Sequence, residues 1–311
     1  MKPFRKHVGI AIDGGGIRGV IVTRALMTLE EALKKSCHEI FRLTAGTSTG
    51  SIISAAIGAG LTAEKINQLY VDLGNTIFKP SWRTFFWPLT KYRYPQEPFK
   101  KALLENIGDI KMGDFWKAKL PTDVVITTFD LLTTKTCFIK PWKSEYKDFP
   151  VKTAVLGSSC VPSFFPVVEG RYVDGGVGAY ANPCYIAAYE ALICLGWKPE
   201  ETTLLSLGTG QSPSLQPGEP EKLIAWQWLE PVEDALFAST SDQQIHLVET
   251  FFPKLDFRRF QVDLTEYIAM DDPSKINDLI VYGEQLGKMI LNDQVDSSMG
   301  IKASLPQKEM V

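Results

Sequence analysis

Residues 8–19 read VGIAIDGGGIRG, and this stretch decides the fold class. Residues 8–12 are a short apolar run rich in β-branched side chains, which is the pattern of a strand buried on both faces of a parallel sheet. A glycine turn follows at once, and residues 17–35 then carry apolar side chains near helical spacing. This order of strand, turn and amphipathic helix predicts an α/β protein.

The same alternation continues along the chain. Residues 40–45 predict a second strand, residues 46–50 a tight turn, and residues 51–59 a helix of small residues. Further strands are predicted at residues 122–128, 135–139, 171–173 and 203–207, and a helix from residue 182 or 183 to 195. We therefore expect an α/β sandwich whose ligands bind at the carboxyl ends of the strands.

The chain of 311 residues also suggests a domain organisation. We predict a catalytic core at residues 1–210, with an aromatic-rich insertion at about residues 78–100. A loop rich in Gly, Pro and Ser at residues 208–221 separates the core from a mainly helical part at residues 211–311. That part is expected to pack on the core, with a flexible tail from about residue 303.

Composition and charge exclude several classes of protein. A hydrophobic content of 45% excludes disorder of the whole chain, and a net charge of −3 gives no general attraction to a nucleic acid polymer. Five cysteines without a CxxC pair predict free thiols in a reducing compartment, and three histidines do not suggest a metal site. With neither a signal peptide nor a membrane span in the sequence, we expect a cytoplasmic protein without a cofactor.

The turn at residues 46–50 reads GTSTG and lies between a predicted strand and a predicted helix. In this setting Ser48 is exposed above the sheet at a helix amino terminus, where developing negative charge is stabilised. Gly46 and Gly50 let the backbone pass without a clash. The motif predicts a nucleophilic serine, and the alternative is a serine that caps the helix.

The turn at residues 13–19 reads DGGGIRG. The amides of Gly14, Gly15 and Gly16 could hold the oxyanion of a tetrahedral acyl intermediate, with Arg18 adding a positive charge. The same residues satisfy the dinucleotide fingerprint GxGxxG, so a dinucleotide-binding oxidoreductase is the rival interpretation. Asp13 would repel a pyrophosphate, and the second strand does not end in the acid that would bind a ribose.

A third motif is the stretch YVDGG at residues 172–176. The carboxylate of Asp174, followed by Gly175 and Gly176, could accept the proton of a serine and return it to the leaving group. An ordinary Asp-Gly turn is the alternative, and on these residues alone the turn is favoured.

Serine hydrolases commonly use a histidine as base, and this chain has three histidines. His7 precedes the first strand, His38 lies in a helix-to-strand connection, and His246 lies in a predicted helix. Their positions favour structural roles. A Ser–Asp dyad is then the economical arrangement.

The three motifs together, DGGGxRG, GTSTG and DGG in this order, resemble the signature of the patatin-like phospholipases, with a bacterial-type lipid acyl hydrolase as the nearest description. The stretches at residues 127–130, 158–166, 182–183 and 205–210 resemble the same family. The similarity extends over about residues 6–210.

The resemblance implies a three-layer α/β/α core with a mainly parallel central sheet. It also implies a calcium-independent phospholipase A or lysophospholipase that forms an acyl-serine intermediate on Ser48, with Asp174 as base. An oxyanion hole from the backbone of residues 14–16, assisted by Arg18, is implied as well. Some members are switched on by a small nucleotide or a partner, and a catalytically idle lipid-binding effector is a further alternative.

Residues 78–94 combine seven aromatic and four basic residues with no acid. This composition suits transient contact with an anionic membrane surface, which would place the protein peripherally at the inner membrane face. The alternative is a subdomain that caps the core. Prolines at positions 80, 88 and 95 interrupt any continuous amphipathic helix, which favours the cap.

Overall fold

The computed structural model describes residues 1–79, 81–86, 89–213 and 229–296, and the tail predicted from about residue 303 lies outside them. One seven-stranded sheet runs through the described part, with the order β4-β3-β2-β1-β6-β7 and with β5 paired to β3. Its strands are β1 (His7–Ile12), β2 (Leu43–Thr47), β3 (Asp123–Asp130), β4 (Lys135–Ile139), β5 (Tyr172–Asp174), β6 (Thr202–Leu207) and β7 (Asp256–Phe260).

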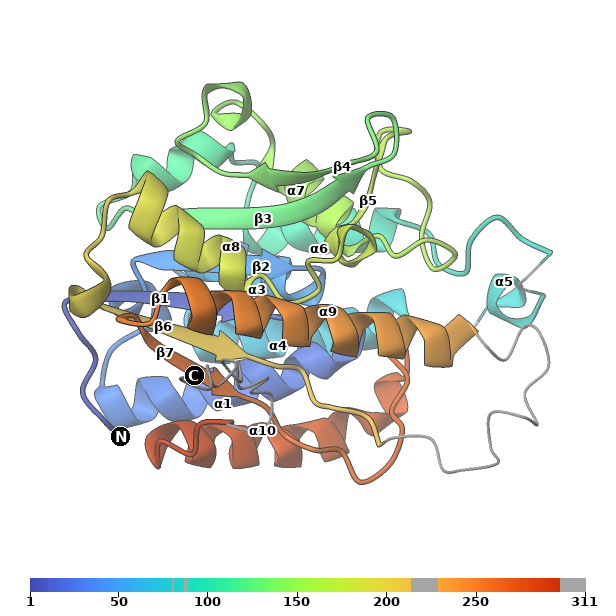
Figure 1. The fold of residues 1–311 in the computed structure, drawn as a ribbon. Helices are drawn as coiled ribbons and strands as arrows, with labels where there is room; N and C mark the ends of the chain where they lie inside the picture. Colours follow the sequence, from blue (N-terminus) through green and yellow to red (C-terminus); the bar gives the residue numbers. More distant parts are fainter. Residues whose placement is uncertain (80, 87–88, 214–228, 297–311) are drawn as a thin grey trace, which may run out of the picture.

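The sheet is mainly parallel (Figure 1). Strand β1 pairs in parallel with β2 and β6, and the parallel pairing continues to β3 on one side and β7 on the other. Only β4 and β5, among the described strands, run antiparallel to their neighbour β3. The carboxyl ends of β1 and β2 therefore lie side by side, which brings the glycine turn next to the Ser48 turn.

Ten α-helices are present in the described residues. They are α1 (Gly19–Leu33), α2 (Cys37–Ile40), α3 (Thr49–Gly58), α4 (Ala63–Ile77), α5 (Trp82–Phe85), α6 (Glu97–Asn106), α7 (Val151–Ser159), α8 (Cys184–Tyr189), α9 (Leu229–Phe251) and α10 (Ile276–Leu291). The short 3-10 helices η1 (Gly16–Arg18) and η4 (Gly175–Gly178) follow β1 and β5, and a π-helix (Glu190–Cys194) continues α8.

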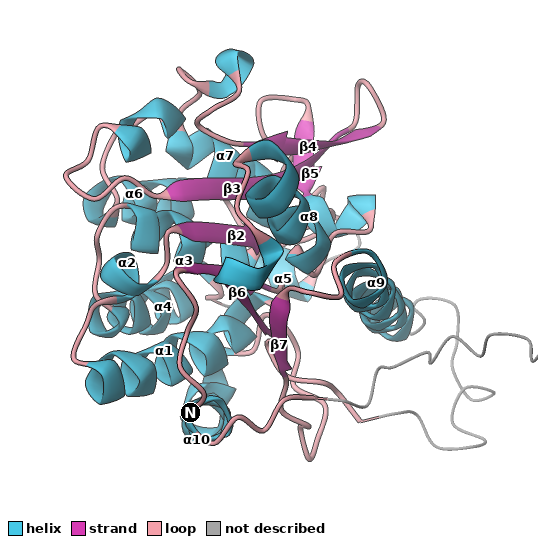
Figure 2. Cartoon of the chain, turned by 60° about the vertical axis from the view of Figure 1, so that its left-hand side comes forward, coloured by secondary structure: helices cyan, strands magenta, loops and turns pink. Residues whose placement is uncertain are grey.

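Helices cover both faces of the sheet (Figure 2). Ile10 and Ile12 of β1 point to one face, into a core built with α1, α3, α4, α7 and α10. Ala11 points to the other face, into a second core with α8 and α9. The period-two alternation of a strand thus feeds two cores, which is why residues 8–12 are apolar throughout. The predicted α/β/α sandwich with a mainly parallel sheet is confirmed.

Two elements differ from the sequence-based assignment. The second strand begins at Leu43, because residues 37–40 form the short helix α2 instead. Strand β7 was not predicted, since its sequence DFRRF places two arginines in a buried strand. It lies beyond residue 210 and pairs with β6, so the sheet continues past the predicted core boundary.

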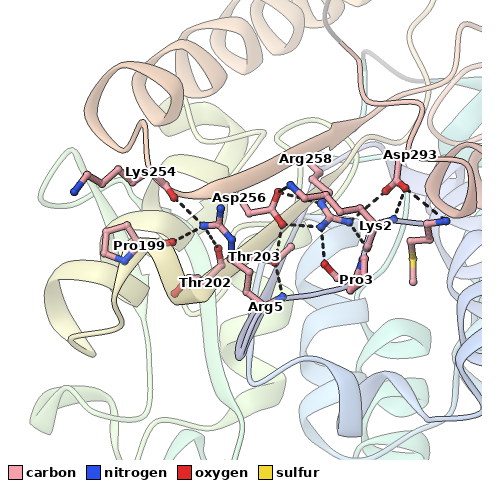
Figure 3. A network of polar contacts seen from close by, with 11 residues as sticks. Lys2, Pro3, Arg5, Pro199, Thr202, Thr203, Lys254, Asp256, Arg258 and Asp293 are labelled. Atoms are coloured by element: carbon pink, nitrogen blue, oxygen red, sulfur yellow. Dashed lines mark hydrogen bonds and ion pairs between the residues drawn. The ribbon is translucent and has the colours of Figure 1, made fainter.

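A polar network fixes β7 to the chain's first residues (Figure 3). Asp256 accepts hydrogen bonds from Lys2 Nζ at 3.0 Å and from Thr203 Oγ1 at 2.9 Å, and Arg258 donates to the carbonyl of Lys2 at 2.9 Å. Burial acts to raise the pKa of Asp256, but hydrogen bonds from Arg258, Lys2 and Thr203 outweigh it and lower the pKa to about 2. This network fixes the strand that carries Arg259.

Candidate active site

Ser48 occupies the sharp turn between β2 and α3. Its backbone has φ +53° and ψ −126°, a strained conformation for a residue with a side chain. Gly46 and Gly50 make the turn feasible, because a Cβ atom at Gly46 would overlap with the Gly50 carbonyl, and one at Gly50 with the Ile12 carbonyl. The predicted strand–turn–helix context of GTSTG is therefore present.

Three hydroxyl groups hold the strained Ser48 backbone. The amide of Ser48 donates to Ser158 Oγ at 2.9 Å. Its carbonyl accepts from Ser51 Oγ at 2.7 Å and from Ser159 Oγ at 2.9 Å. Strain of this kind persists only where the surroundings over-determine it. Sequence reasoning missed these roles, although the paired serines at the end of a small-residue segment were a visible signal.

Asp174 ends β5 and lies opposite Thr128 of β3. Its side chain is 2% exposed, and Oδ1 accepts a hydrogen bond from the Gly176 amide at 2.7 Å. Burial raises the pKa of Asp174 to about 6, while the nearby Ser48 hydroxyl and the Gly176 amide act to lower it. Oδ2 has no hydrogen-bond partner among the described residues. The structure thus places the buried carboxyl of Asp174 beside the Ser48 hydroxyl.

Each of the three carbonyls of the glycine turn accepts a hydrogen bond from a neighbouring group. Thr209 Oγ1 donates to the Gly14 carbonyl at 2.5 Å, and Thr49 Oγ1 donates to the Gly16 carbonyl at 2.6 Å. The Gly15 carbonyl accepts from the amide of Arg18 at 3.1 Å and from its Nε at 3.4 Å. These bonds fix the orientation of the peptide groups, so the turn is preorganised.

The amides of the turn divide into two kinds. Gly14 donates to the Ala181 carbonyl at 2.9 Å, so its amide is already engaged. The amides of Gly15 and Gly16 have no hydrogen-bond partner within the described residues. Of the three amides in the predicted oxyanion hole, those of Gly15 and Gly16 are therefore the ones open to a ligand oxygen. Arg18 is buried and contacts the Gly15 carbonyl and Ser212 Oγ, so it supports the turn.

Asp13, at the start of the turn, forms a buried ion pair. Arg259 of β7 donates to Oδ1 at 2.9 Å and to Oδ2 at 2.6 Å. Burial raises the pKa of Asp13, and Arg259 opposes that effect. On the other side of the turn, a Cβ atom at Gly16 would overlap with the Met270 carbonyl. The main chain of residue 270 therefore occupies space beside the turn, which disfavours a bound pyrophosphate.

A cavity that is open in part to solvent lies beside Ser48. Ser48 itself is 6% exposed. Most of the lining is aliphatic or aromatic and includes Ile52, Leu73, Phe78, Phe99, Phe165 and Met270. An apolar cavity beside a serine hydroxyl suits a substrate with a hydrocarbon chain.

The aromatic segment, residues 78–94, has two parts. Phe78 and Tyr94 are packed against Phe165, with ring centroids 6.4 and 5.9 Å from it, and Phe78 and Phe165 line the cavity. Trp82, Phe86 and Leu89 are exposed, and Leu89 reaches 88%. Trp87 lies outside the described residues.

The histidines lie away from this cavity. His7 stacks on Trp197 at 4.9 Å, His38 Nδ1 is 2.9 Å from the Ile57 carbonyl, and His246 Nε2 is 3.5 Å from Thr250 Oγ1 in α9. None of them lines the cavity. In the described residues no cluster of three or more His, Cys, Asp or Glu could hold a metal ion. Nor does any helix of that part combine the length and apolar character needed to cross a bilayer.

Fold and site together define an α/β protein with a serine on a strand–turn–helix at an apolar cavity. The family model of the patatin-like phospholipases matches residues 10–188. The chain therefore belongs to the patatin-like phospholipase family. This membership, together with the packing of residue 270 against the glycine turn, leaves the dinucleotide interpretation without support.

Several relatives are 26–28% identical to this chain over the aligned residues. The intracellular phospholipase A2 of Caenorhabditis elegans is 27% identical over 66% of this chain, which spans only 20% of that protein. Patatin-like protein 1 of Oryza sativa is 28% identical over 77% of this chain and 69% of its own length. Patatin-08 of Solanum tuberosum is 26% identical over 90% of this chain and 83% of its own length. Among solved structures, VipD from Legionella pneumophila has a TM-score of 0.49 at 11% identity, covering 94% of this chain and 67% of that one.

Proposed function

We propose that the chain is a lipid acyl hydrolase of the phospholipase A or lysophospholipase type. One observation carries the proposal: the strained Ser48 lines an apolar cavity, close to a buried carboxyl with an unpartnered oxygen. A pKa of about 6 leaves Asp174 mostly ionised at neutral pH, so it can accept a proton there. Family membership and a phospholipase among the relatives support the lipid substrate.

In the proposed reaction, Ser48 Oγ attacks the acyl carbonyl carbon while Asp174 Oδ2 takes the hydroxyl proton. The carbonyl oxygen of the substrate becomes an oxyanion, which the amides of Gly15 and Gly16 stabilise. The C–O bond to the lysolipid or glycerol oxygen then breaks, and that oxygen receives the proton from Asp174. Water repeats the sequence on the acyl-serine and releases the fatty acid.

The proposal includes contact with a lipid surface through the aromatic segment. Its exposed Trp82, Phe86 and Leu89 belong to the same stretch as Phe78, which lines the cavity. Arg83 lies over the rings of Trp82 and Tyr92, at 4.8 and 4.7 Å from their centroids. Aromatic and basic groups in this combination suit the headgroup region of an anionic bilayer. Activation by a small nucleotide or a partner, and a cytoplasmic location, stay predictions.

A catalytically idle lipid-binding effector is the remaining alternative, and one experiment separates the two. A mixed lipid extract is incubated with wild type, Ser48→Ala and Asp174→Asn, and released fatty acids and lysolipids are measured by mass spectrometry. We expect release by wild type and a loss of at least about 10³-fold in Ser48→Ala. Ser54→Ala is a matched control, because this buried serine of the same helix has an Oγ without a hydrogen-bond partner. Release at the wild-type rate by both site variants contradicts the mechanism.

A further inference from the structure

Residues 261–272, here called the cover loop, follow β7 and lie against the glycine turn. The amide of Ile17 donates to the Met270 carbonyl at 2.8 Å. The same carbonyl is the atom that a Cβ at Gly16 would meet first, and the Met270 side chain lines the cavity. The position of the Met270 main chain therefore determines where Gly16 lies.

Asp271, the next residue, binds two groups at the base of the aromatic segment. Its Oδ2 accepts hydrogen bonds from Tyr94 OH at 3.0 Å and from Arg93 Nη1 at 3.1 Å. The side chains of Asp271 and Arg93 are each 14% exposed, so their charge-assisted hydrogen bond is only weakly screened. Burial, together with the charge of Asp271, raises the pKa of Tyr94, which keeps its hydroxyl protonated as a donor.

Arg93 and Tyr94 in turn hold the aromatic wall of the cavity. The Tyr94 ring meets Phe78 edge-on at 5.3 Å, and the Arg93 guanidinium lies 4.5 Å from the centroid of Phe164. Their amides donate to the carbonyls of residues 163 and 164 at 3.0 and 2.8 Å. Phe78 and Phe164 both line the cavity. The contacts of Asp271 thus reach the aromatic side of the cavity that Met270 also lines.

We propose that Asp271 is a positioning residue for hydrolysis: its carboxylate joins the cover loop to the aromatic wall and so keeps Met270 against the glycine turn. This inference rests on the proposed function. The remainder of the loop is attached separately, through Thr265 Oγ1 and Tyr282 OH at 2.7 Å and through an ion pair of Glu266 with Lys275. A change at Asp271 therefore acts locally, on the spacing between the turn and the cavity wall.

The test compares Asp271→Asn with wild type in the full chain, on a soluble short-chain chromogenic ester. A misplacement of a catalytic group by about 1 Å can lower the rate about 100-fold. We expect Asp271→Asn to displace Met270 and the glycine turn by less than that, so kcat should fall about tenfold. KM should change less than about twofold, since the apolar lining is unchanged. Glu284→Gln is the control, because it removes an ion pair of similar type, with Arg24 at 2.8 Å, between α10 and α1. We expect it to keep the wild-type kcat.

Tyr94→Phe provides a second variant that removes a single donor to Asp271. It should lower kcat in the same direction by a smaller factor, and it decides the question if Asp271→Asn does not fold. A wild-type kcat in the folded variant, or an equal loss of kcat in Glu284→Gln, overturns the proposal. Failure of the proposed function is seen separately, as ester hydrolysis that survives in Ser48→Ala.

Discussion

The glycine turn at residues 13–19 and the aromatic segment at residues 78–94 both border the cavity, but they differ in how firmly the chain holds them. Each carbonyl of Gly14 to Gly16 accepts a hydrogen bond, and the amide of Ile17 is bound to Met270. In the aromatic segment, Trp82 is 62% exposed and Leu89 more so. Groups that must meet a developing charge need a fixed geometry, whereas groups that meet a lipid surface need exposed apolar area.

The largest expected effect lies in the turn. Gly16 has a backbone φ of +58°, which disfavours a residue with a side chain. In Gly16→Ala the new Cβ would also overlap with the Met270 carbonyl. We expect a loss of at least about 3 kcal/mol in the free energy of unfolding, measured by chemical denaturation, together with loss of activity.

Gly170→Ala is the matched control for that variant. Gly170 has a similar φ of +65°, but nothing lies within 4 Å of a Cβ built there. This substitution should therefore lower the free energy of unfolding by only about 1 kcal/mol, the cost of placing a side chain on a left-handed backbone. Equal losses in the two variants would contradict the claim that packing against residue 270 sets the turn.

The next effect concerns Asp174 and its dependence on pH. The folded-state pKa of about 6 lies above the value near 3.9 of an unfolded chain. The stabilising contribution of the protonated carboxyl is therefore fully present below about pH 4 and is lost as the pH rises through 6, about 3 kcal/mol in all. The amide of Asp174→Asn does not titrate and so does not lose this contribution. The free energy of unfolding of the variant, relative to wild type, should therefore increase between pH 5 and pH 8 by roughly half of the 3 kcal/mol.

The activity of wild type should follow the ionised carboxylate. We expect kcat/KM to rise about tenfold per pH unit below pH 6 and to level off above it, measured with a soluble ester. A stability difference between wild type and Asp174→Asn that does not vary with pH would show that the carboxyl is not perturbed in the way the structure indicates.

The smallest effect on stability is expected in the aromatic segment. Replacing Trp82, Phe86 and Leu89 with serine should change the free energy of unfolding by no more than about 0.5 kcal/mol each, because all three are exposed. Binding to anionic vesicles, measured by sedimentation, should weaken at least about tenfold, since a loss of 1.4 kcal/mol already gives that factor. Hydrolysis of a soluble ester should be unchanged.

Exposed apolar residues that do not line the cavity supply the control for vesicle binding. Ile193 follows α8 and Val281 lies on α10, and both are exposed. Ile193→Ser and Val281→Ser should bind vesicles like wild type. If they weaken binding as much as the aromatic variant does, the membrane contact does not depend on residues 78–94.

The local parts of the fold were predictable from the sequence, whereas the long-range ones were not. Strand β1, the turns at Ser48 and Asp174 and the flanking helices follow from apolar runs broken by glycines. Arg259 gave no such signal, because its burial depends on Asp13, which is 246 residues away. For the same reason the engaged amide of Gly14 was missed, since its acceptor is the carbonyl of Ala181. Pairings between distant segments leave no periodic pattern in a single sequence.

If Ser48 is a nucleophile activated by Asp174, covalent labelling will detect both roles. Wild type and Asp174→Asn are treated with a fluorophosphonate, and the modified peptide is mapped by mass spectrometry at several reaction times. We expect a single adduct on Ser48 in wild type and much slower labelling of the same residue in Asp174→Asn. An adduct on another residue, no adduct at all, or equal rates in the two proteins would contradict these roles.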